Sequence, residues 1–473
     1  MKQSVLIGII VVVLVIAIAA AILATQRPSN TAPQSSTSAP APTSTTTQSA
    51  APTASASSAT SVSASQCPDV IVIGTPAAIS GKYSTEGQYI LWGALAAVNW
   101  INDHGGINCG SKMVKVKLIY QDCQSNAQLA QSIAENLITQ QHVNFLLSPY
   151  GSDLALAVSP IAEKYGVLMA VVGASSDRIF QQGFKYVIGV ASPASHYFWS
   201  VLDMVKAIDP TAKTVAILYS DDEFDRYVAM GAKAHAQQLG FQVVVYDPYP
   251  PTTQDVTTQV LDVKNAKPDI ILVAAHYADG QLVTQTLYQQ NVNAKLIAIT
   301  VAPLVPDYYN ALRVGNGSLA ECIVGPSHWE PGVNYTPDLA KQKGIDWFGP
   351  TRDEFISYFR QVAKQMSGKE VDPGYEAGWA AEGVLVLLYG VQKAGSVDPN
   401  LVRQALANSD FMTFFGEFKM NATNGLNIAH SMVVTQWQAG QRVVIWPASA
   451  AQSNPFYPSL TWSQKASGQL CKP

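Results

Sequence analysis

Apolar and polar stretches alternate along residues 69–447 in a pattern that predicts strands and helices in turn. Short β-branched runs are separated by longer stretches in which apolar residues recur at helical spacing. A first series of strands is expected at Val70–Ile73, Val114–Tyr120, Asn144–Leu147, Val167–Val172 and Tyr186–Val190, and a second series at Val215–Tyr219, Gln242–Tyr246, Ile270–Ala274 and Leu296–Thr300. Near-continuous apolar strands between helices are typical of parallel sheets with both faces covered.

The helices and the break between the two strand series predict two lobes. The break falls at Ala191-Ser192-Pro193, where proline favours an extended connection. Helices are expected at Asn126–Gln140, Ser152–Tyr165, Asp222–Leu239, Gln254–Ala266, Asp279–Gln290, Arg352–Met366 and Tyr375–Ala394, and closing strands at Glu417–Met420, Met432–Gln436 and Val443–Trp446. The predicted fold class is therefore α/β, with two Rossmann-like lobes built on parallel sheets.

The N-terminus carries a membrane-type segment followed by an uncharged stretch. Val5–Ala24 is an unbroken apolar run of about 20 residues, enough for a helix to cross a membrane. We expect residues 1–27 to be a single-pass transmembrane anchor; a cleaved signal peptide is the alternative, because Ala19-Ala20-Ala21 offers a cleavage site. Residues 28–68, rich in Ser, Thr, Ala and Pro, are expected to form a disordered stalk. The body then lies extracellularly at the cell membrane, or is secreted.

Composition and cysteines suit an exported protein without a nucleic-acid partner. Charged residues make up 13% of the chain, against the ~25% typical of soluble domains, and the net charge of −4 leaves no basic surface for nucleic acid.

Cys67 precedes the first strand and Cys109 follows the first helix, which runs back to the same sheet edge, so they form the best local disulfide. Cys322 and Cys471 are the remaining pair, which leaves Cys123 free. Three sequons are candidates for N-glycosylation: Asn316, Asn334 and Asn421.

The sequence motifs of common enzymes are missing. No G-x-x-x-x-G-K-[ST] loop occurs, and no G-x-G-x-x-G follows the first strand. The segment 173–177 (GASSD) begins like the turn of a serine hydrolase but ends in Asp where that turn requires Gly. The seven histidines lack paired spacing, so no metal is expected, and His276, at a strand end, is expected to be a hydrogen-bonded wall residue. We therefore expect no enzymatic activity and no cofactor.

Two strand ends of the first series have the chemistry of a small-solute site. Ligands of open α/β sheets bind at the carboxyl ends of the strands. One strand ends just before Ser152, where the N–H groups of a helix start suit a carboxylate, although the serine alternatively only caps the helix. The next strand ends in Gly173 and Ser175, whose carbonyl and hydroxyl can bind a ligand, with an ordinary Gly/Ser turn as the alternative.

The segment Asn99–Ile107 (NWINDHGGI), with Ile79-Ser80-Gly81 and the order of elements, resembles the type I periplasmic binding proteins of the branched-chain amino acid (Leu/Ile/Val) transport family. This resemblance covers about Asp69 to Pro447. It implies two lobes that are joined by three crossovers and close over a small solute, and delivery to the permease and ATPase subunits of an ABC importer. The expected parts are residues 69–191 and 330–420 for lobe 1, 192–329 and 421–447 for lobe 2, and 448–473 for a tail packed on a lobe.

The resemblance also implies roles for individual residues. Ser152 and Ser175 match residues that hold the ligand carboxylate, and Gly173 matches one whose carbonyl meets the ligand ammonium. Three aromatic residues match positions that close on the ligand or line its pocket: Phe224, Tyr277 and Tyr375. Tyr83 and Tyr150 are expected to extend this aromatic wall.

One position departs from the pattern of the family. Amino-acid binders of this family place a carboxylate after the strand that here ends at Thr300, and Val301 stands there. A buried ammonium without a partner costs several kcal/mol, so either another acid supplies the charge or the ligand is not an α-amino acid. Glu86 is the candidate acid, with a solvated carboxylate in the loop after the first strand as its alternative role; Asp222 and Glu223 are further candidates.

The sequence therefore predicts an extracytoplasmic solute-binding protein of an ABC importer. Branched-chain or other apolar amino acids are the expected ligands, and amides, urea-like solutes and aromatic carboxylates are alternatives because of Val301. A sensory ectodomain that reports to a separate signalling subunit is one rival function. A secreted α/β hydrolase that uses Ser175 is the other.

Overall fold

The computed structural model describes residues 67–472, and the following statements concern that range. The predicted anchor and nearly all of the predicted stalk, residues 1–66, lie outside it. Within the described range, no helix combines the length and the apolar character needed to cross a membrane.

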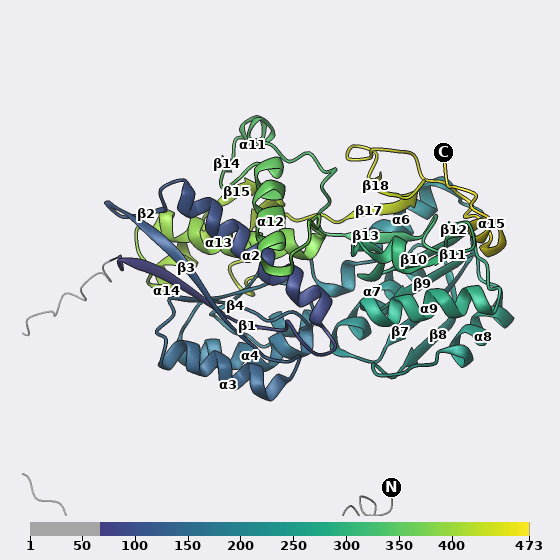
Figure 1. The fold of residues 1–473 in the computed structure, drawn as a ribbon, viewed down its shortest axis with the longest axis horizontal. Helices are drawn as coiled ribbons and strands as arrows, with labels where there is room; N and C mark the ends of the chain where they lie inside the picture. The colour runs from purple at the N-terminus through teal and green to yellow at the C-terminus, as the bar shows by residue number, and fades with distance from the viewer. Residues whose placement is uncertain (1–66, 473) are drawn as a thin grey trace, which may run out of the picture. The chain divides into compact units, whose positions relative to one another are not determined.

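A six-stranded sheet forms the centre of the first lobe (Figure 1). Its order is β2-β3-β1-β4-β5-β6, with the strands β1 (Val70–Ala77), β2 (Ile107–Cys109), β3 (Lys112–Asp122), β4 (Phe145–Leu147), β5 (Met169–Val171) and β6 (Val187–Gly189). The helices of this lobe are α2 (Ser84–Asp103), α3 (Ala127–Thr139), α4 (Ser152–Tyr165), α5 (Asp177–Phe180), α11 (Pro337–Lys343), α12 (Arg352–Ser367), α13 (Tyr375–Ala394) and α14 (Pro399–Ala407). A small sheet of β14 (Asp346–Trp347), β15 (Asp410–Thr413) and β16 (Gly416–Lys419) completes it.

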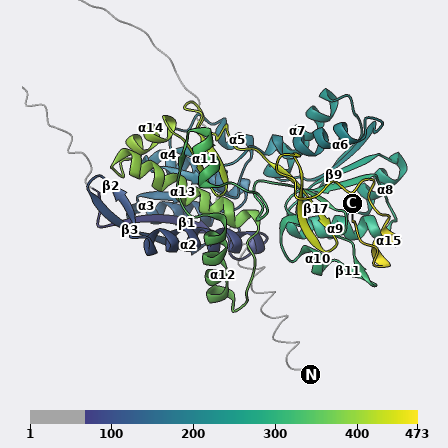
Figure 2. The same ribbon diagram turned by 90° about the horizontal axis from the view of Figure 1, so that it is seen from above.

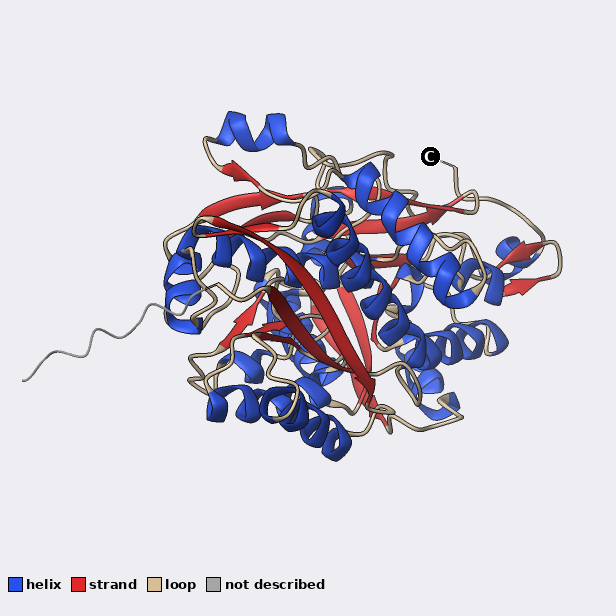
Figure 3. Cartoon of the chain, turned by 60° about the vertical axis from the view of Figure 1, so that its left-hand side comes forward, coloured by secondary structure: helices blue, strands red, loops and turns tan. Residues whose placement is uncertain are grey.

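A seven-stranded sheet forms the centre of the second lobe. Its order is β18-β17-β13-β10-β9-β7-β8, with the strands β7 (Thr214–Ser220), β8 (Gln242–Tyr249), β9 (Ile270–Ala274), β10 (Leu296–Ile299), β13 (Val324–Ser327), β17 (Val433–Gln438) and β18 (Gln441–Trp446). The other elements are the 3-10 turns η1 (Ala194–His196) and η2 (Ala302–Leu304), the helices α6 (Trp199–Ile208), α7 (Glu223–Gln238), α8 (Thr257–Ala266), α9 (Tyr277–Gln289), α10 (Tyr308–Ala311) and α15 (Trp462–Ala466), and the hairpin β11 (Arg313–Val314) and β12 (Gly317–Ser318). In Figure 3 the helices cover the strands of both sheets.

Three strands of the two central sheets pair antiparallel beside the parallel strands that the sequence predicted. β2 pairs antiparallel with β3, and β17 pairs antiparallel with both β13 and β18. The β2–β3 and β17–β18 connections are tight turns with positive φ at Gly110, Ala439 and Gly440. A turn this short can only join antiparallel strands, because a parallel pair needs a long crossover. The remaining central strands pair in parallel, as predicted.

The helix α13 lies at the centre of the first lobe. It is buried from Tyr375 to Val391 because it packs against α2, α14, β4 and β5. Gly93 of α2 makes this close packing possible, since a Cβ there would lie 2.1 Å from the carbonyl oxygen of Ala377. Figure 2 shows α12 and α13 with β1 and β3, whereas β17 lies with β9 in the other lobe.

The chain passes between the two hydrophobic cores three times. Residues up to Ala191 belong to the first core and residues from Ala194 to the second. After β13 the chain returns, because Trp329 packs in the first core, and between Met420 and Met432 it leaves again. These passages are the hinge segments of a two-lobed protein.

Two disulfides hold the ends of the described chain. Cys67 is bonded to Cys109, and Cys322 to Cys471, while Cys123 is free and buried; both predicted pairs are therefore present. Cys67, placed by the sequence at the end of the stalk, is thus tied to the first sheet. The tail packs on the second lobe, where Trp462 is buried and its indole N–H donates to the carbonyl of Val292.

Candidate functional site

A small cavity between the two lobes gathers most of the predicted ligand-binding residues. Six of the nine line it: Tyr150, Ser152, Gly173, Ser175, Phe224 and Tyr375. Four further residues complete its wall: Tyr197, His276, Val301 and Trp379. Its volume is about 10 Å³, which is room for about one water molecule. The lobes are therefore closed more tightly than any organic solute would allow.

Ser152 begins α4 but does not cap it. The N-cap is Gly151, with φ 100°, so the alternative of simple capping by the serine was wrong. The Ser152 hydroxyl oxygen instead accepts hydrogen bonds from the N–H groups of Ser175 (3.2 Å) and Ser176 (3.1 Å). No acceptor for its own hydroxyl hydrogen lies within residues 67–472, so this buried group has a hydrogen bond to give.

Gly173 lies where only glycine fits. Its φ is 61°, and a Cβ would lie 2.6 Å from the ring of Tyr150. Its carbonyl accepts a hydrogen bond from the N–H of Gly151 (3.0 Å), which leaves one lone pair for a ligand.

Ser175 is connected to the hinge segments by a row of hydrogen bonds, here called the hinge chain (Ser175, Tyr197, His328 and His430). The Ser175 hydroxyl donates to the hydroxyl of Tyr197 (3.3 Å), which meets His328 Nε2 at 2.8 Å, and His328 Nδ1 lies 3.2 Å from His430 Nε2. Burial lowers the pKa of both imidazoles, that of His430 to about 3, so they are neutral near pH 7. Among the described residues no histidine hydrogen-bonds Ser175, which removes the general base that a hydrolase would need.

Tyr83 and Tyr277 lie outside this cavity. Tyr83 lines a neighbouring cavity of about 290 Å³, and its hydroxyl donates to Asp153 (3.0 Å) within the first lobe. The ring of Tyr277 is half-buried, and its hydroxyl lies 3.5 Å from Asp307. These two residues are therefore placed at the rim of the site.

Glu86 is not the solvated loop residue that the sequence allowed. It lies in the first turn of α2, is 2% exposed, and accepts a hydrogen bond from the N–H of Tyr277 (3.0 Å). Burial raises the pKa of its carboxyl, although the charge of His276 opposes that shift. Glu86 therefore connects α2 of the first lobe to the first residue of α9 in the second lobe.

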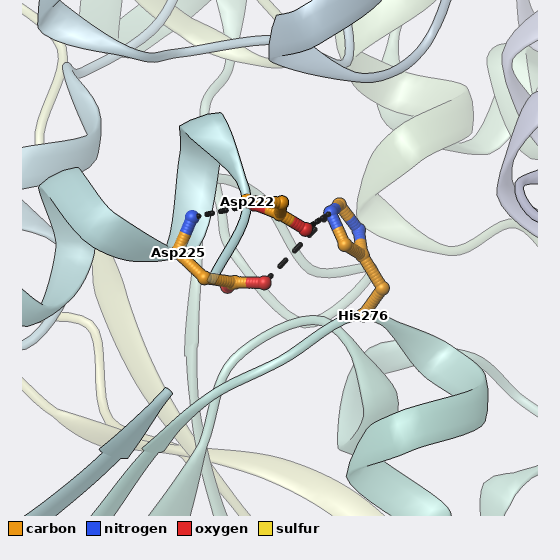
Figure 4. A group of neighbouring side chains, drawn as sticks. All are labelled: Asp222, Asp225 and His276. Carbon is orange, nitrogen blue, oxygen red and sulfur yellow. Dashed lines mark hydrogen bonds and ion pairs between the residues drawn. The ribbon is translucent and has the colours of Figure 1, made fainter. Parts of the chain in front are cut away.

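His276 forms another contact between the two lobes. Its Nδ1 meets the hydroxyl of Tyr150 at 2.9 Å, and its Nε2 lies 3.3 Å from Asp222 and 3.9 Å from Asp225 (Figure 4). Burial alone would lower its pKa, but the charge and hydrogen bond of Asp222, together with the charges of Glu86 and Asp279, outweigh burial and raise the pKa to about 9. The same attraction lowers the pKa of Asp222 against the effect of burial.

Val301, which replaces the acid of the family pattern, lines the cavity in an unusual conformation. It is buried, and its φ is 42°, a value that β-branched residues rarely adopt. Such backbone strain is concentrated at functional sites. This wall is therefore apolar where a carboxylate was to be expected.

Residues 70–442 match the periplasmic binding protein family. The chain belongs to this family. Among its relatives, a Leu/Ile/Val-binding protein homologue of Brucella abortus is 27% identical over 395 residues, which are 81% of this chain and 93% of the relative. This places the protein among the type I binding proteins of the branched-chain amino acid family, with a body suited to the outside of the cytoplasm, and confirms the resemblance seen in the sequence.

Two solved structures share the fold of this periplasmic binding protein. A branched-chain amino acid transporter substrate-binding protein from Streptococcus pneumoniae, in complex with isoleucine, is 19% identical with a TM-score of 0.64, and the match covers 80% of this chain and 100% of that one. An ABC transporter solute-binding protein from Rhodopseudomonas palustris, in complex with p-hydroxybenzoic acid, is 18% identical with a TM-score of 0.66, and the match covers 84% and 99%. The chain thus has the fold of ABC-transporter solute-binding proteins.

Proposed function

We propose that this protein captures a small apolar amino acid, outside the cytoplasm, for an ABC importer. The observation that carries the proposal is the buried Ser152 hydroxyl at the start of α4, which has a hydrogen left to donate into a cavity walled by both lobes. A helix start and a free hydroxyl together favour a carboxylate. Ser175, in the same wall, adds a second hydroxyl to that end of the solute.

Aromatic side chains give this site its preference for an apolar solute body. Tyr150, Tyr375 and Trp379 come from the first lobe and Tyr197 and Phe224 from the second, and all five line the cavity. The solute ammonium would donate to the carbonyl of Gly173, which lies in the same wall and has one lone pair free. Relatives named for binding leucine, isoleucine and valine support this solute class.

Capture requires the lobes to separate, because the closed cavity has a volume of only about 10 Å³. Separation breaks the contacts of Tyr150 with His276 and of Glu86 with Tyr277. A solute that touches both lobes then favours a closed form through its own contacts, which is a shift between two populations.

Aromatic carboxylates are the second candidate class. Val301 supplies no charge for an ammonium, and the wall is rich in rings that can stack on an aromatic solute. The Rhodopseudomonas palustris protein with p-hydroxybenzoic acid shows that this fold accommodates such a ligand.

The location of the body follows from the segments before it. We infer that Val5–Ala24 anchors the chain in the membrane and that residues 28–66 form a stalk, which holds the two lobes near a permease. Asn316 and Asn334 are exposed and Asn421 is half-buried, so the first two are the better acceptors for glycans.

A thermal-unfolding screen tests the proposed function. The body is heated with leucine, isoleucine, p-hydroxybenzoate, acetamide or urea, each at increasing concentration. A solute at 100 times its Kd stabilises the folded state by about 2.7 kcal/mol. We expect leucine or isoleucine to raise the unfolding temperature most. A response to p-hydroxybenzoate alone would establish the second class, and no response to any carboxylate would refute both.

A further inference from the structure

Two carboxylates and one imidazole of the second lobe meet beside the solute cavity. Asp222 caps α7, Asp225 lies in its first turn, and His276 precedes α9. Figure 4 shows the three side chains pointing toward one another. We propose that Asp222, Asp225 and His276 bind a divalent transition-metal ion, with Zn²⁺ as the best fit.

Asp225 is the observation that points to a missing cation. Its side chain is 0% exposed, and neither carboxylate oxygen has a hydrogen-bond partner within the described range. His276 Nε2 also makes no hydrogen bond there, although Asp222 lies 3.3 Å away. A buried, unpaired carboxylate is very costly, whereas a metal ion would satisfy all three groups at once.

The spacing of the donor atoms fits a small metal ion. One donor atom of each residue lies within 4.8 Å of the others, and Nε2 is 3.3 Å and 3.9 Å from the two aspartates. Tetrahedral ligands at the usual zinc distances of about 2.0–2.2 Å are about 3.3–3.5 Å apart. The two pairs that include His276 Nε2 therefore need to move by about 0.6 Å or less, and the two aspartate oxygens lie within 4.8 Å of each other.

The surroundings orient these donors as metal sites do. The hydroxyl of Tyr150 holds His276 Nδ1 at 2.9 Å, so Nε2 is the nitrogen that faces the aspartates. One oxygen of Asp222 accepts the N–H groups of Phe224 (2.9 Å) and Asp225 (3.0 Å), and the other, which accepts only a long hydrogen bond from the Ser220 hydroxyl (3.5 Å), faces His276 and can bind the metal. Such second contacts fix ligand orientation in protein metal sites.

The charge balance and the open side favour a divalent ion. Asp279 and Glu86 add to the negative field at His276. Lys82, the nearest ammonium acting on Asp225, is partly exposed and paired with Asp153. The cavity of about 290 Å³ is lined by Asp222 and His276, so water or a solute oxygen can reach a fourth coordination position.

One imidazole with two carboxylates favours zinc over magnesium. Imidazole suits Zn²⁺ and related transition metals, whereas Mg²⁺ prefers oxygen ligands throughout. Zinc also accepts the four-coordinate arrangement that these three residues and one water provide.

Calorimetric titration with ZnCl2 tests this site without any solute, so its failure would leave the proposed function standing. The full chain, without a histidine tag, is purified in mild detergent, treated with EDTA and dialysed. We expect one Zn²⁺ per chain, and at least about 10-fold weaker binding in Asp225→Asn and in His276→Gln. MgCl2 should give much weaker binding than ZnCl2.

Asp203→Asn is the matched control. Asp203 forms the other aspartate–histidine pair of this lobe, with His235 at 2.8 Å, but the described residues place no second carboxylate in a metal-binding group with it. This variant should bind Zn²⁺ like the wild type. Thermal unfolding in EDTA verifies that each variant folds, and the visible spectrum of the wild type with Co²⁺ should show four-coordination independently of any variant. Absence of stoichiometric Zn²⁺ binding, a preference for Mg²⁺, or unchanged binding in both ligand variants would overturn the proposal.

Discussion

Two buried sites, one in each lobe, keep their acids in different states. In the first lobe, Glu376 and Glu382 belong to α13, and burial raises the pKa of each to about 8, so both are neutral at pH 7. In the second lobe, Asp222 faces His276, and their attraction lowers the pKa of the aspartate although burial opposes it. Burial thus neutralises an acid that has little beside it, whereas a facing imidazole preserves the charge.

The same contrast divides the solute cavity. The first lobe contributes hydroxyls and backbone groups whose partners are largely in place, such as Ser152. The second lobe contributes the rings of Tyr197 and Phe224, the apolar Val301 and the charged imidazole of His276, beside which the Asp225 carboxyl has no hydrogen-bond partner in the described residues. The first lobe thus presents neutral polar groups to the cavity, and the second lobe presents one charged group.

The largest expected effect concerns the neutral acid Glu382. Its one polar partner in the described chain is the hydroxyl of Thr413, which donates to it at 2.5 Å. The unfolded carboxyl loses its proton near pH 4.5 and the folded one near pH 8, so the free energy of unfolding should fall between these values by up to about 5 kcal/mol. Glu382→Gln should reduce the measured fall by this amount and leave the part that Glu376 contributes, as measured by urea unfolding from pH 4.5 to 8. The exposed Glu370→Gln is the control and should retain the wild-type slope.

A buried base in the second lobe should give the opposite pH dependence. The ammonium of Lys465 has no hydrogen-bond partner in residues 67–472, and burial lowers its pKa to about 7. Between pH 7 and 10.5 the unfolded chain still holds this proton, so the free energy of unfolding should rise with pH, by up to about 5 kcal/mol. The Trp462 ring, 4.3 Å from the ammonium, favours the charged form and reduces this rise. Lys465→Met should flatten the rise; equal slopes for both proteins in urea unfolding would contradict this.

The carboxylate-binding half is tested at Ser152. Ser152→Ala removes the donor and should weaken binding of the solute found in the thermal screen by about 10- to 100-fold, as expected for a hydrogen bond to a charged group. Ser159→Ala is the matched control, because Ser159 lies in the same helix but donates to the carbonyl of Ala155. Calorimetric titration gives both affinities, and equal losses would show that the effect comes from the helix.

The smallest effect concerns the contact between the lobes. Tyr150→Phe removes the hydrogen bond to His276, worth about 1 kcal/mol, and should shift the solute-free protein toward an open form. Tyr83→Phe removes a bond of similar length to Asp153 inside one lobe and should not. Small-angle scattering should therefore show a larger radius of gyration for the first variant alone.

Much of the fold could be predicted because apolar runs and strand ends are local signals. The bounds of α4, α13 and β9 agree with the sequence pattern. α6 was not predicted, and β13 (VGPS) carries Gly and Pro and is a strand only because β10 and β17 pair with it. Its strand character comes from tertiary pairing, which no local propensity reveals.

The candidate site was predictable at strand ends and not elsewhere. Ser152, Gly173 and Ser175 follow strands of one sheet, so their convergence could be expected. Tyr197 and Trp379 reach the cavity from a hinge segment and a late helix, and their approach depends on the folding of both lobes. The pairing of His276 with Asp225 likewise joins two helix starts, which histidine spacing in the sequence could not show.

The hinge chain connects the wall of the solute cavity to residues that do not line the cavity. His430 and His328 lie in two separate passages between the lobes, and through Tyr197 they reach Ser175. Bending these passages should change the distances along that row, so a movement of the hinge also moves Ser175 in the cavity wall. Under the proposed function, a substitution at His430, which does not line the cavity, should therefore change how long a solute stays bound.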